Sequence, residues 1–238
     1  MRIGGFQKLT LVDFPGKVAA VVFVQGCNFR CGYCHNPELV LPQFFVGADL
    51  VSARSILDYL NGRRGKLEGV VITGGEPTFQ EGLVDFITRL KEMGFAVKLD
   101  TNGSHPEVVS SLIGLNLLDY IAMDIKSSLA KYSRVTGVAC DTAKIRESID
   151  LIVKSGVSYQ LRTTLVKEFC SREDLSDIRH LIEKADHYSL QPFVPSQKMV
   201  DVRFNDQSQY TPAEIELLKT EFEKSVLSPS SNTLWPKD

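Results

Sequence analysis

The sequence predicts an α/β protein built on an open sheet of six parallel strands, with helices on the outside. Six short apolar runs alternate along the chain with segments whose apolar residues recur at helical spacing, the pattern of repeated strand–helix units. The first of these runs is continuous rather than alternating, as in a strand buried on both faces. Six units are too few to close an eight-stranded barrel of typically about 250 residues. We therefore expect a partial (β/α)6 barrel of the TIM type.

The first strand follows an N-terminal extension. Residues 1–17 contain a short apolar stretch that meets the turn signal Pro15-Gly16, which predicts a short strand or hairpin in front of the core. The run 18–24 is rich in β-branched residues and lies between Gly16 and Gly26, so it is expected to form the first buried strand. The residues from Cys27 onwards then lie at the carboxyl end of that strand.

The later elements repeat this unit, and capping residues mark several helix starts. Thr142 is expected to be an N-cap, and Ser171-x-x-Asp174 is a capping signal. Thr211-Pro212-Ala213-Glu214 combines an N-cap threonine, a proline at the first helical position and a capping glutamate. We predict further strands at 69–73, 96–99, 120–123, 158–166 and 187–191, and helices at 52–61, 83–90, 108–113, 143–153, 175–182 and from 212 onwards.

Composition is that of an ordinary globular chain of 238 residues, 43% apolar and 24% charged. The formal charge of -2 shows no basic excess, which argues against a nucleic-acid partner. The N-terminus lacks the apolar core of a signal peptide, and the run 18–24 is far shorter than the roughly 20 residues that span a bilayer. We expect one cytoplasmic domain over residues 1–227, without membrane contact, and a disordered tail at 228–238.

Three of the five cysteines fall within eight residues. Cys27, Cys31 and Cys34 have C-x3-C-x2-C spacing, while Cys140 and Cys170 stand alone and are expected in ordinary packing. Thiolates bind iron–sulfur clusters, and a 4Fe-4S cluster normally has a protein ligand on each iron. Three clustered cysteines would leave one iron open to a substrate or cofactor, as catalytic metal sites keep an open position.

The alternative to an iron–sulfur cluster at this motif is a structural zinc site, and the role of Tyr33 is also open. A structural zinc site needs four closed ligands, usually in pairs, and no second cysteine pair exists. His35 could complete such a site, but it adjoins Cys34, and neighbouring residues seldom both reach one ion. Tyr33 has two open roles, contact with whatever occupies the open iron and plain packing.

Polar motifs also follow the next strands. Because the carboxyl ends of parallel strands meet at one edge, we expect these motifs and the cysteines to converge on one cleft. Gly74 and Gly75 end the second buried strand, where glycines let the backbone approach a ligand closely. Glu76 either binds the ligand or holds its loop, and the second role is favoured.

Three charged residues follow the third and fourth buried strands. Asp100 and Asp124 end consecutive strands, and Lys126 lies on the same side as Asp124 by strand periodicity. Each alone could be a solvated or capping charge. Together at one mouth they suit a zwitterionic ligand, with carboxylates for an ammonium group and a lysine for a carboxylate.

The cysteine motif with Tyr33, followed by Gly74-Gly75-Glu76 after the next strand, resembles the radical S-adenosylmethionine (SAM) superfamily. The resemblance implies a 4Fe-4S cluster whose open iron is chelated by the amino and carboxylate groups of SAM. It also implies that the reduced cluster cleaves the sulfonium, releasing methionine and a 5'-deoxyadenosyl radical.

Longer segments are similar to the glycyl-radical-enzyme activases within that superfamily. These are QGCNFRCGYCHNP at 25–37, LDTNG at 99–103 and MDIK at 123–126, while LVDFPGK at 11–17 resembles the activating proteins of anaerobic ribonucleoside-triphosphate reductases. The resemblance covers about residues 6–165. It implies a partner enzyme that receives a glycyl radical, an anaerobic ribonucleoside-triphosphate reductase by the last of these segments. It also implies a low-potential electron donor such as reduced flavodoxin.

The resemblance also assigns ligand roles. The Gly74-Gly75 strand end and Asp100 would take the methionyl amino group, Lys126 its carboxylate, and Asp124 a place in the same polar floor. The chain departs from the pyruvate formate-lyase activators, which carry a histidine after the sixth strand, where this chain has QPFV at 191–194. That departure counts against this particular partner, and the cysteine count excludes an activase with an auxiliary cluster.

Two other functions stay open at this point. A radical SAM enzyme acting on a small molecule, such as a deazaguanine-type synthase, would share the short barrel. A ferredoxin-like electron carrier would need four cluster cysteines and no SAM site, whereas this chain offers three clustered cysteines and a glycine-rich strand end.

Overall fold

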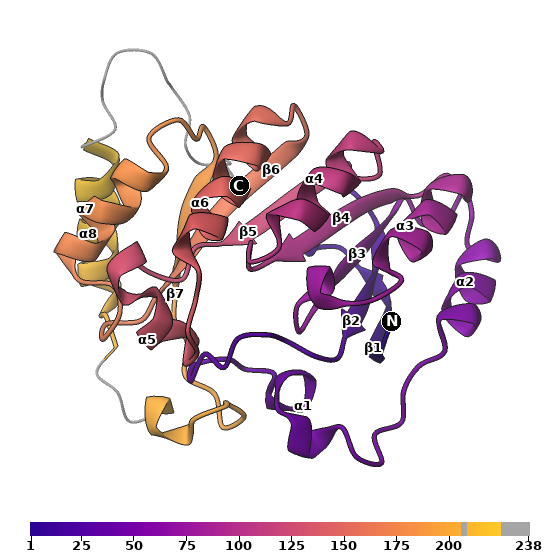
Figure 1. Cartoon of the computed structure of the whole chain (residues 1–238), viewed down its shortest axis with the longest axis horizontal. Helices are drawn as coiled ribbons and strands as arrows, with labels where there is room; N and C mark the ends of the chain where they lie inside the picture. Colours follow the sequence, from indigo (N-terminus) through magenta and orange to yellow (C-terminus); the bar gives the residue numbers. More distant parts are fainter. Residues whose placement is uncertain (206–208, 225–238) are drawn as a thin grey trace.

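The computed structural model describes residues 1–205 and 209–224 (Figure 1). Within these residues, seven strands form one sheet in the same order as in the chain, and the sheet does not close on itself. The predicted partial barrel of six parallel strands is confirmed, with one antiparallel strand added at its edge. The strands are β1 Ile3–Thr10, β2 Ala19–Val24, β3 Gly69–Gly74, β4 Ala96–Thr101, β5 Tyr120–Asp124, β6 Ser158–Leu165 and β7 Tyr188–Pro192.

The added strand belongs to the N-terminal extension. β1 runs antiparallel to β2, with Ile3 opposite Val24 and Thr10 opposite Ala19. The two strands and the turn between them form a hairpin, as the Pro-Gly signal predicts. The turn carries Phe14 into the barrel, where its side chain is 2% exposed.

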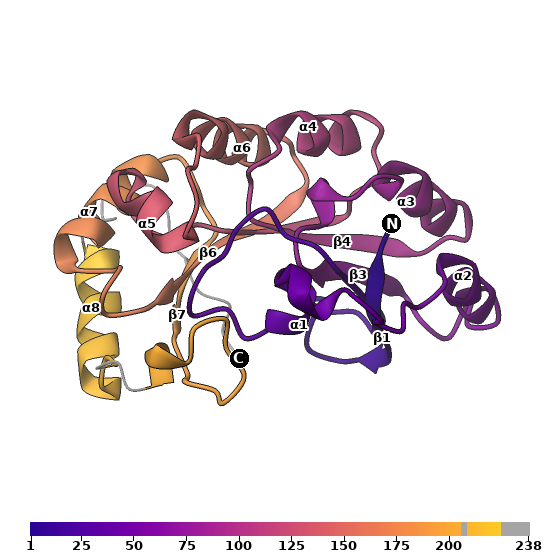
Figure 2. The ribbon, with the colours of Figure 1, turned by 60° about the horizontal axis from the view of Figure 1, so that its bottom comes forward.

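Helices cover the outer side of the sheet, as predicted. Figures 1 and 2 show α2, α3, α4 and α6 side by side along one face of the sheet. Two short helices, α1 and α5, were not expected from the sequence. The helices are α1 Pro37–Val40, α2 Ala53–Asn61, α3 Leu83–Glu92, α4 Pro106–Gly114, α5 Tyr132–Thr136, α6 Thr142–Lys154, α7 Arg172–Leu181 and α8 Pro212–Lys224.

The predicted capping residues are mostly confirmed. Ser171 and Asp174 form a reciprocal capping box at the start of α7. At α8 the Thr211 amide donates to Glu214, and the Glu214 amide donates to the Thr211 hydroxyl. The prediction for α6 was wrong by one residue. Its N-cap is Asp141, whose carboxylate accepts a hydrogen bond from the amide of Ala143, because a carboxylate caps an N-terminus at least as well as a hydroxyl does.

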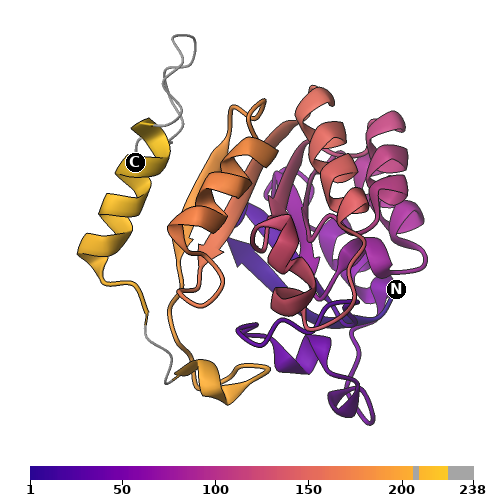
Figure 3. The same ribbon diagram turned by 60° about the vertical axis from the view of Figure 1, so that its left-hand side comes forward.

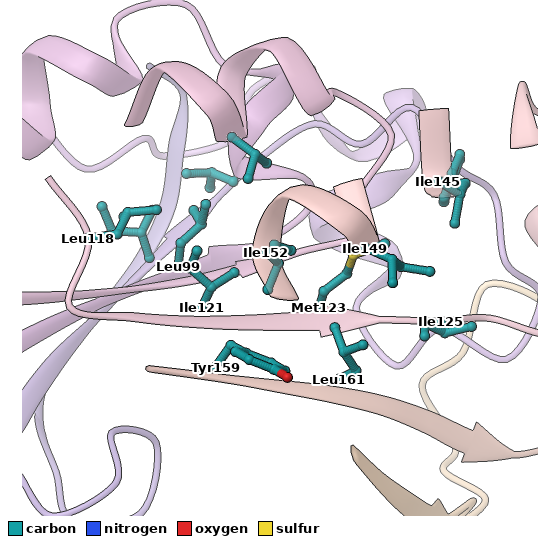
Figure 4. Close-up of a cluster of buried hydrophobic side chains, with 14 of the residues drawn as sticks. Leu99, Leu118, Ile121, Met123, Ile125, Ile145, Ile149, Ile152, Tyr159 and Leu161 are labelled. Carbon is teal, nitrogen blue, oxygen red and sulfur yellow. The ribbon is translucent and has the colours of Figure 1, made fainter. Parts of the chain in front are cut away.

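Side chains of each strand alternate between an outer core under the helices and the interior of the barrel. Figure 4 shows part of the outer core, where Ile121 and Met123 of β5 lie beneath Ile149 and Ile152 of α6. The interior is smaller and is closed at the amino ends of the strands by Phe14, which packs with Ala19, Val21 and Val71. The apolar interior therefore occupies one end of the barrel and leaves the other end for polar residues.

No helix within the described ranges is long and apolar enough to cross a bilayer. The tail at 228–238, predicted to be disordered, lies outside the described residues.

Candidate functional site

All of the residues predicted for the site line one cavity at the carboxyl ends of the parallel strands. It also takes in the end of β6 and a phenylalanine that follows β7. The convergence expected from strand polarity is therefore present in the structure. The predicted residues in the lining are Cys27, Cys31, Tyr33, Cys34, Gly74, Gly75, Glu76, Asp100, Asp124 and Lys126.

Hydrogen bonds to backbone groups of the cysteine loop hold it in place. The Arg30 guanidinium donates to the carbonyl oxygens of Cys27 and Phe29, at 2.6 and 2.7 Å. The Arg30 amide donates to the carbonyl of Thr136 in α5 at 2.7 Å. Next to it, a Cβ on Gly137 would lie 2.7 Å from the Arg30 carbonyl, so α5 can approach the loop only where a glycine ends it. The loop is thus held by the side chain of its own Arg30 and by the end of α5.

Burial keeps the three thiols protonated in the metal-free protein. It raises the pKa of Cys27 to about 12 and that of Cys31 to about 11, and it also raises the pKa of Cys34. Iron binding must therefore displace these protons, and the metal supplies the charge that makes a thiolate stable there.

The donor set fits a cluster better than a single ion. Across residues 1–205 and 209–224, no three histidine, cysteine, aspartate or glutamate side chains converge on one point as ligands of a single metal ion would. The thiols of Cys27, Cys31 and Cys34 nonetheless line one cavity. In a 4Fe-4S cluster each thiolate binds its own iron, so three separated thiols around one space are what such a cluster requires.

The two glycines at the end of β3 bring that strand against the start of the cysteine loop. Gly74 has φ +110°, and a Cβ on Gly75 would lie 2.1 Å from the carbonyl oxygen of Gly26. The amides of Gly75 and Glu76 donate to the carbonyls of Val24 and Gly26, both at 2.8 Å. Close approach between two strand ends thus requires these glycines, which is a reason additional to the ligand approach expected from the sequence.

Glu76 is 1% exposed, and its carboxylate joins two strand ends. One oxygen accepts hydrogen bonds from the amide and hydroxyl of Thr78 and from the hydroxyl of Thr101. The other accepts from the amide of Asn102 at 2.7 Å. Burial raises the pKa of Glu76, and these donated hydrogen bonds counter the rise. The contacts favour the loop-holding role.

Asn102 extends this connection to the cysteine loop. Its side-chain amide donates to the Asn28 side-chain oxygen at 3.0 Å, and Asn28 in turn donates to the Ser104 hydroxyl at 2.8 Å. Glu76, Asn102 and Asn28 therefore link the ends of β3 and β4 to the loop that carries the thiols. Movement of the cysteine loop or of either strand end would therefore displace the other two.

A chain of alternating charges forms the polar floor of the cavity. Lys98 lies 2.5 Å from Asp100, and Arg162 lies 3.4 Å from the other oxygen of Asp100. Arg162 also pairs with Asp124, whose second oxygen lies 3.0 Å from Lys126. Arg162 and Lys126 thus pair with carboxylates of the cavity lining, and Lys98, which is not part of that lining, pairs with Asp100.

Electrostatic coupling keeps Asp124 and Lys126 ionised. Burial opposes charge on Asp124, but Arg162 and Lys126 outweigh it and hold the pKa of that carboxyl well below its usual range. Burial likewise opposes charge on Lys126, and the Asp124 carboxylate raises the Lys126 pKa well above its ordinary value. Asp124 and Lys126 therefore present fixed charges to a ligand at any physiological pH.

Lys98 and Arg162 belong to this chain of charges and were missed in the sequence. Both had a signal. Strand periodicity puts Lys98 on the same face as Asp100, two residues on, and the parallel register sets Arg162 directly beside Asp124. These signals do not assign either residue to the site unless it is known which face of each strand points into the barrel.

Tyr33 lies in an aromatic cluster at the edge of the cavity and is 8% exposed. Its ring centroid lies 6.2 Å from Phe169, 6.0 Å from Phe193 and 6.2 Å from Phe204. His35 stacks on the other side of Phe193 at 5.6 Å. Tyr33 therefore packs against the protein and also lines the cavity, so both roles predicted for it are compatible with its position.

The chain is similar to known proteins in sequence and in fold. The profile of the radical SAM superfamily matches residues 21–182. A protein of Methanocaldococcus jannaschii described as a glycyl-radical enzyme activating enzyme is 38% identical over 198 residues, which are 81% of this chain and 80% of that protein. The pyruvate formate-lyase-activating enzyme of Clostridium pasteurianum is 30% identical over 196 residues, 76% of each chain.

Likeness to solved structures extends to the fold alone. The crystal structure of Streptococcus suis SuiB bound to precursor peptide SuiA matches with a TM-score of 0.67 at 14% identity. The match covers 90% of this chain and 47% of the SuiB chain, so this chain spans about half the length of that protein.

Proposed function

The chain belongs to the radical SAM superfamily, in its group of glycyl-radical-enzyme activating enzymes, and we propose that it activates an anaerobic ribonucleoside-triphosphate reductase. It does so by generating a radical on a backbone glycine of that partner. What supports this most is the meeting of three thiols, a glycine strand end and a charged floor in one cavity.

Cys27, Cys31 and Cys34 would hold a 4Fe-4S cluster, with SAM bound in the same cavity. The reduced cluster would supply the electron that splits SAM into methionine and a 5'-deoxyadenosyl radical, the group that would take a hydrogen atom from the glycine. The chain's own residues position the cofactor and keep water away. The hydrogen bonds from Glu76 through Asn102 to Asn28 fix the loop against the strand ends that receive SAM.

The charged floor matches the methionine part of SAM. Asp100 and Asp124 are carboxylates that can accept from its ammonium group, and Lys126 can donate to its carboxylate. Each of these groups already has a protein partner of opposite charge, which holds it in place before the ligand arrives.

The choice of partner rests on two segments of the sequence. LVDFPGK at 11–17 resembles the reductase activators, and QPFV at 191–194 lacks the histidine of the pyruvate formate-lyase activators. A low-potential carrier such as reduced flavodoxin supplies the electron, because the cluster must reach the negative part of the roughly -700 to +450 mV range of iron–sulfur centres.

Electron paramagnetic resonance tests this function directly. The cluster-loaded protein is incubated without oxygen with SAM, dithionite and an anaerobic ribonucleoside-triphosphate reductase. We expect a glycyl radical doublet on the reductase, and none when Cys31→Ala replaces the wild-type protein. A doublet on another glycyl radical enzyme only would reassign the partner. No doublet on any of them, together with turnover of a small molecule such as a deazaguanine precursor, would refute the activase function.

A further inference from the structure

A segment beyond the region matched by the superfamily profile packs directly on the cysteine loop. The profile ends at residue 182, and residues 193–204, which we call the strap, follow β7. Figure 3 shows this gold segment turning below the strand ends before the chain reaches α8. The strap therefore lies outside the region that the superfamily profile matches.

Backbone hydrogen bonds fasten the strap to the cysteine motif itself. The amide of Val200 donates to the carbonyl of Cys34 at 2.9 Å, and the amide of Asp201 donates to the carbonyl of Gly32 at 2.8 Å. These two carbonyls flank Tyr33, between the second and third cysteines. The strap therefore fixes the part of the loop that positions Cys31 and Cys34.

Aromatic packing seals the same contact. Phe204 is 7% exposed, and a Cβ on Gly32 would lie 2.5 Å from its ring, so the ring lies directly on the loop backbone. Phe193 and Phe204, both from the strap, contact Tyr33, and Met199 is buried in the same apolar core. A glycine at position 32 is what allows this approach.

Phe204 also lines a second cavity. That second cavity, of about 430 Å³, is lined by Gly32, Phe204 and charged residues that include Arg134, Asp201 and Arg203. A water molecule takes about 30 Å³ in the liquid, so this space holds water readily. Phe204 packs on Tyr33, and Tyr33 lines the cluster cavity.

We propose that the strap acts as a positioning and sealing element for the cluster. It fixes the thiols of Cys31 and Cys34 and keeps water of the second cavity away from the iron–sulfur centre. Solvent exposure and the surrounding apolar shell are among the factors that set the potential of such centres. Reduction adds negative charge, which water stabilises, so a sealed cluster keeps a lower potential. Exclusion of water and of the oxygen dissolved in it slows the oxidative loss of the cluster. The proposal does not depend on which molecule receives the radical.

Removal of the Phe204 ring tests the seal. In Phe204→Ala we expect the cluster to be lost in air several-fold faster than in wild type, and its midpoint potential to rise. Phe204→Leu, which refills most of the space, should restore both toward wild type. Cluster loss is followed by absorbance, and the potential by redox titration with paramagnetic resonance, with neither SAM nor partner present, so failure here is distinguishable from failure of the activase function.

The matched control is Phe95→Ala, which removes an equally buried ring, 3% exposed, that lines neither cavity. It should lower thermal stability and leave the potential and the rate of cluster loss unchanged. Equal acceleration in both variants would overturn the proposal, as would wild-type values in Phe204→Ala.

Hydrogen exchange on the wild-type protein gives a test that needs no variant. The amides of Val200 and Asp201 should be protected in the cluster-loaded protein, because both donate to the cysteine loop. Exchange as fast as that of unpaired amides would refute the strap even if Phe204→Ala failed to fold.

Discussion

Replacement of Glu76 by glutamine separates the two roles that the sequence left open for this residue. In Glu76→Gln one side-chain oxygen can keep its three hydrogen bonds to Thr78 and Thr101. The other oxygen becomes an NH2 group, which faces the Asn102 amide and cannot accept from it. The variant thus loses one charge-assisted hydrogen bond and leaves a buried N–H without a partner.

The size of the effect follows from these contacts. Loss of a hydrogen bond to a charged group, with its donor left buried, costs about 2–4 kcal/mol of the free energy of unfolding. For a chain of this size, that lowers the Tm by roughly 5–15 °C. If Glu76 only holds the loop, the Kd of SAM should change by no more than about threefold, since no ligand contact is lost.

Calorimetry can measure both quantities. Thermal unfolding of the metal-free protein gives the Tm, and titration of SAM into the cluster-loaded protein at low temperature gives the Kd. Glu92→Gln, an exposed glutamate at the end of α3, serves as the control and should stay within about 0.5 kcal/mol of wild type. An unchanged Tm with a Kd weakened about 10–100-fold would refute the loop-holding role and assign Glu76 to the ligand.

Three further predictions concern the thiols, the floor and a buried carboxylate. Cys31→Ala should abolish both the cluster and 5'-deoxyadenosine production, and a variant that keeps full activity would remove the assignment. Lys126→Ala should weaken SAM binding about 10–100-fold and spare the cluster, because Arg162 still pairs with Asp124; unchanged affinity would contradict the carboxylate role. Burial opposes charge on Asp174, but hydrogen bonds, the largest of them from Lys131, lower the pKa of its carboxyl. The charged carboxylate therefore stabilises the fold above the unfolded pKa of about 3.9. This contribution is lost as the pH falls through the folded pKa. Asp174→Asn should therefore be less stable than wild type at neutral pH by about 1–3 kcal/mol, with a gap that closes below about pH 4 in unfolding curves; a gap independent of pH would disprove the assignment.

The polarity of the strands was enough to predict where the site lies. Polar motifs follow the carboxyl ends of consecutive parallel strands, so Cys27, Gly74 and Asp124 had to meet on one edge. Strand order follows chain order within the described residues, which is the simplest arrangement of repeated units.

Residues inside the barrel were harder to predict. Lys98 and Arg162 sit within strands, where a lone charge does not show whether its side faces helices or the interior. Lys98 pairs with Asp100 of its own strand, two residues on, whereas Arg162 pairs with Asp124 of the neighbouring strand, and this second pairing depends on register. Asp141 rather than Thr142 caps α6 because two adjacent residues can both cap a helix, and only the backbone decides between them.

Contacts between distant segments left no local signal at all. Gly32 is a small residue in a cysteine loop, and only the structure shows that the Phe204 ring lies against it. The same holds for the amides of Val200 and Asp201, because backbone groups carry no mark of their partners in the sequence.

The strap also bears on the order in which the protein is assembled. Each strand pairs with the one made just before it, whereas the strap must reach back from near the end of the chain to Gly32 and Cys34. Such a long loop closes at an entropic cost that grows with its length, and a chain leaves the ribosome from its N-terminus. The thiols are thus made early and enclosed late, which gives iron and sulfide a period of access during synthesis. Iron and sulfide added during refolding should load more cluster than the same amounts added afterwards, and equal loading would argue against this order.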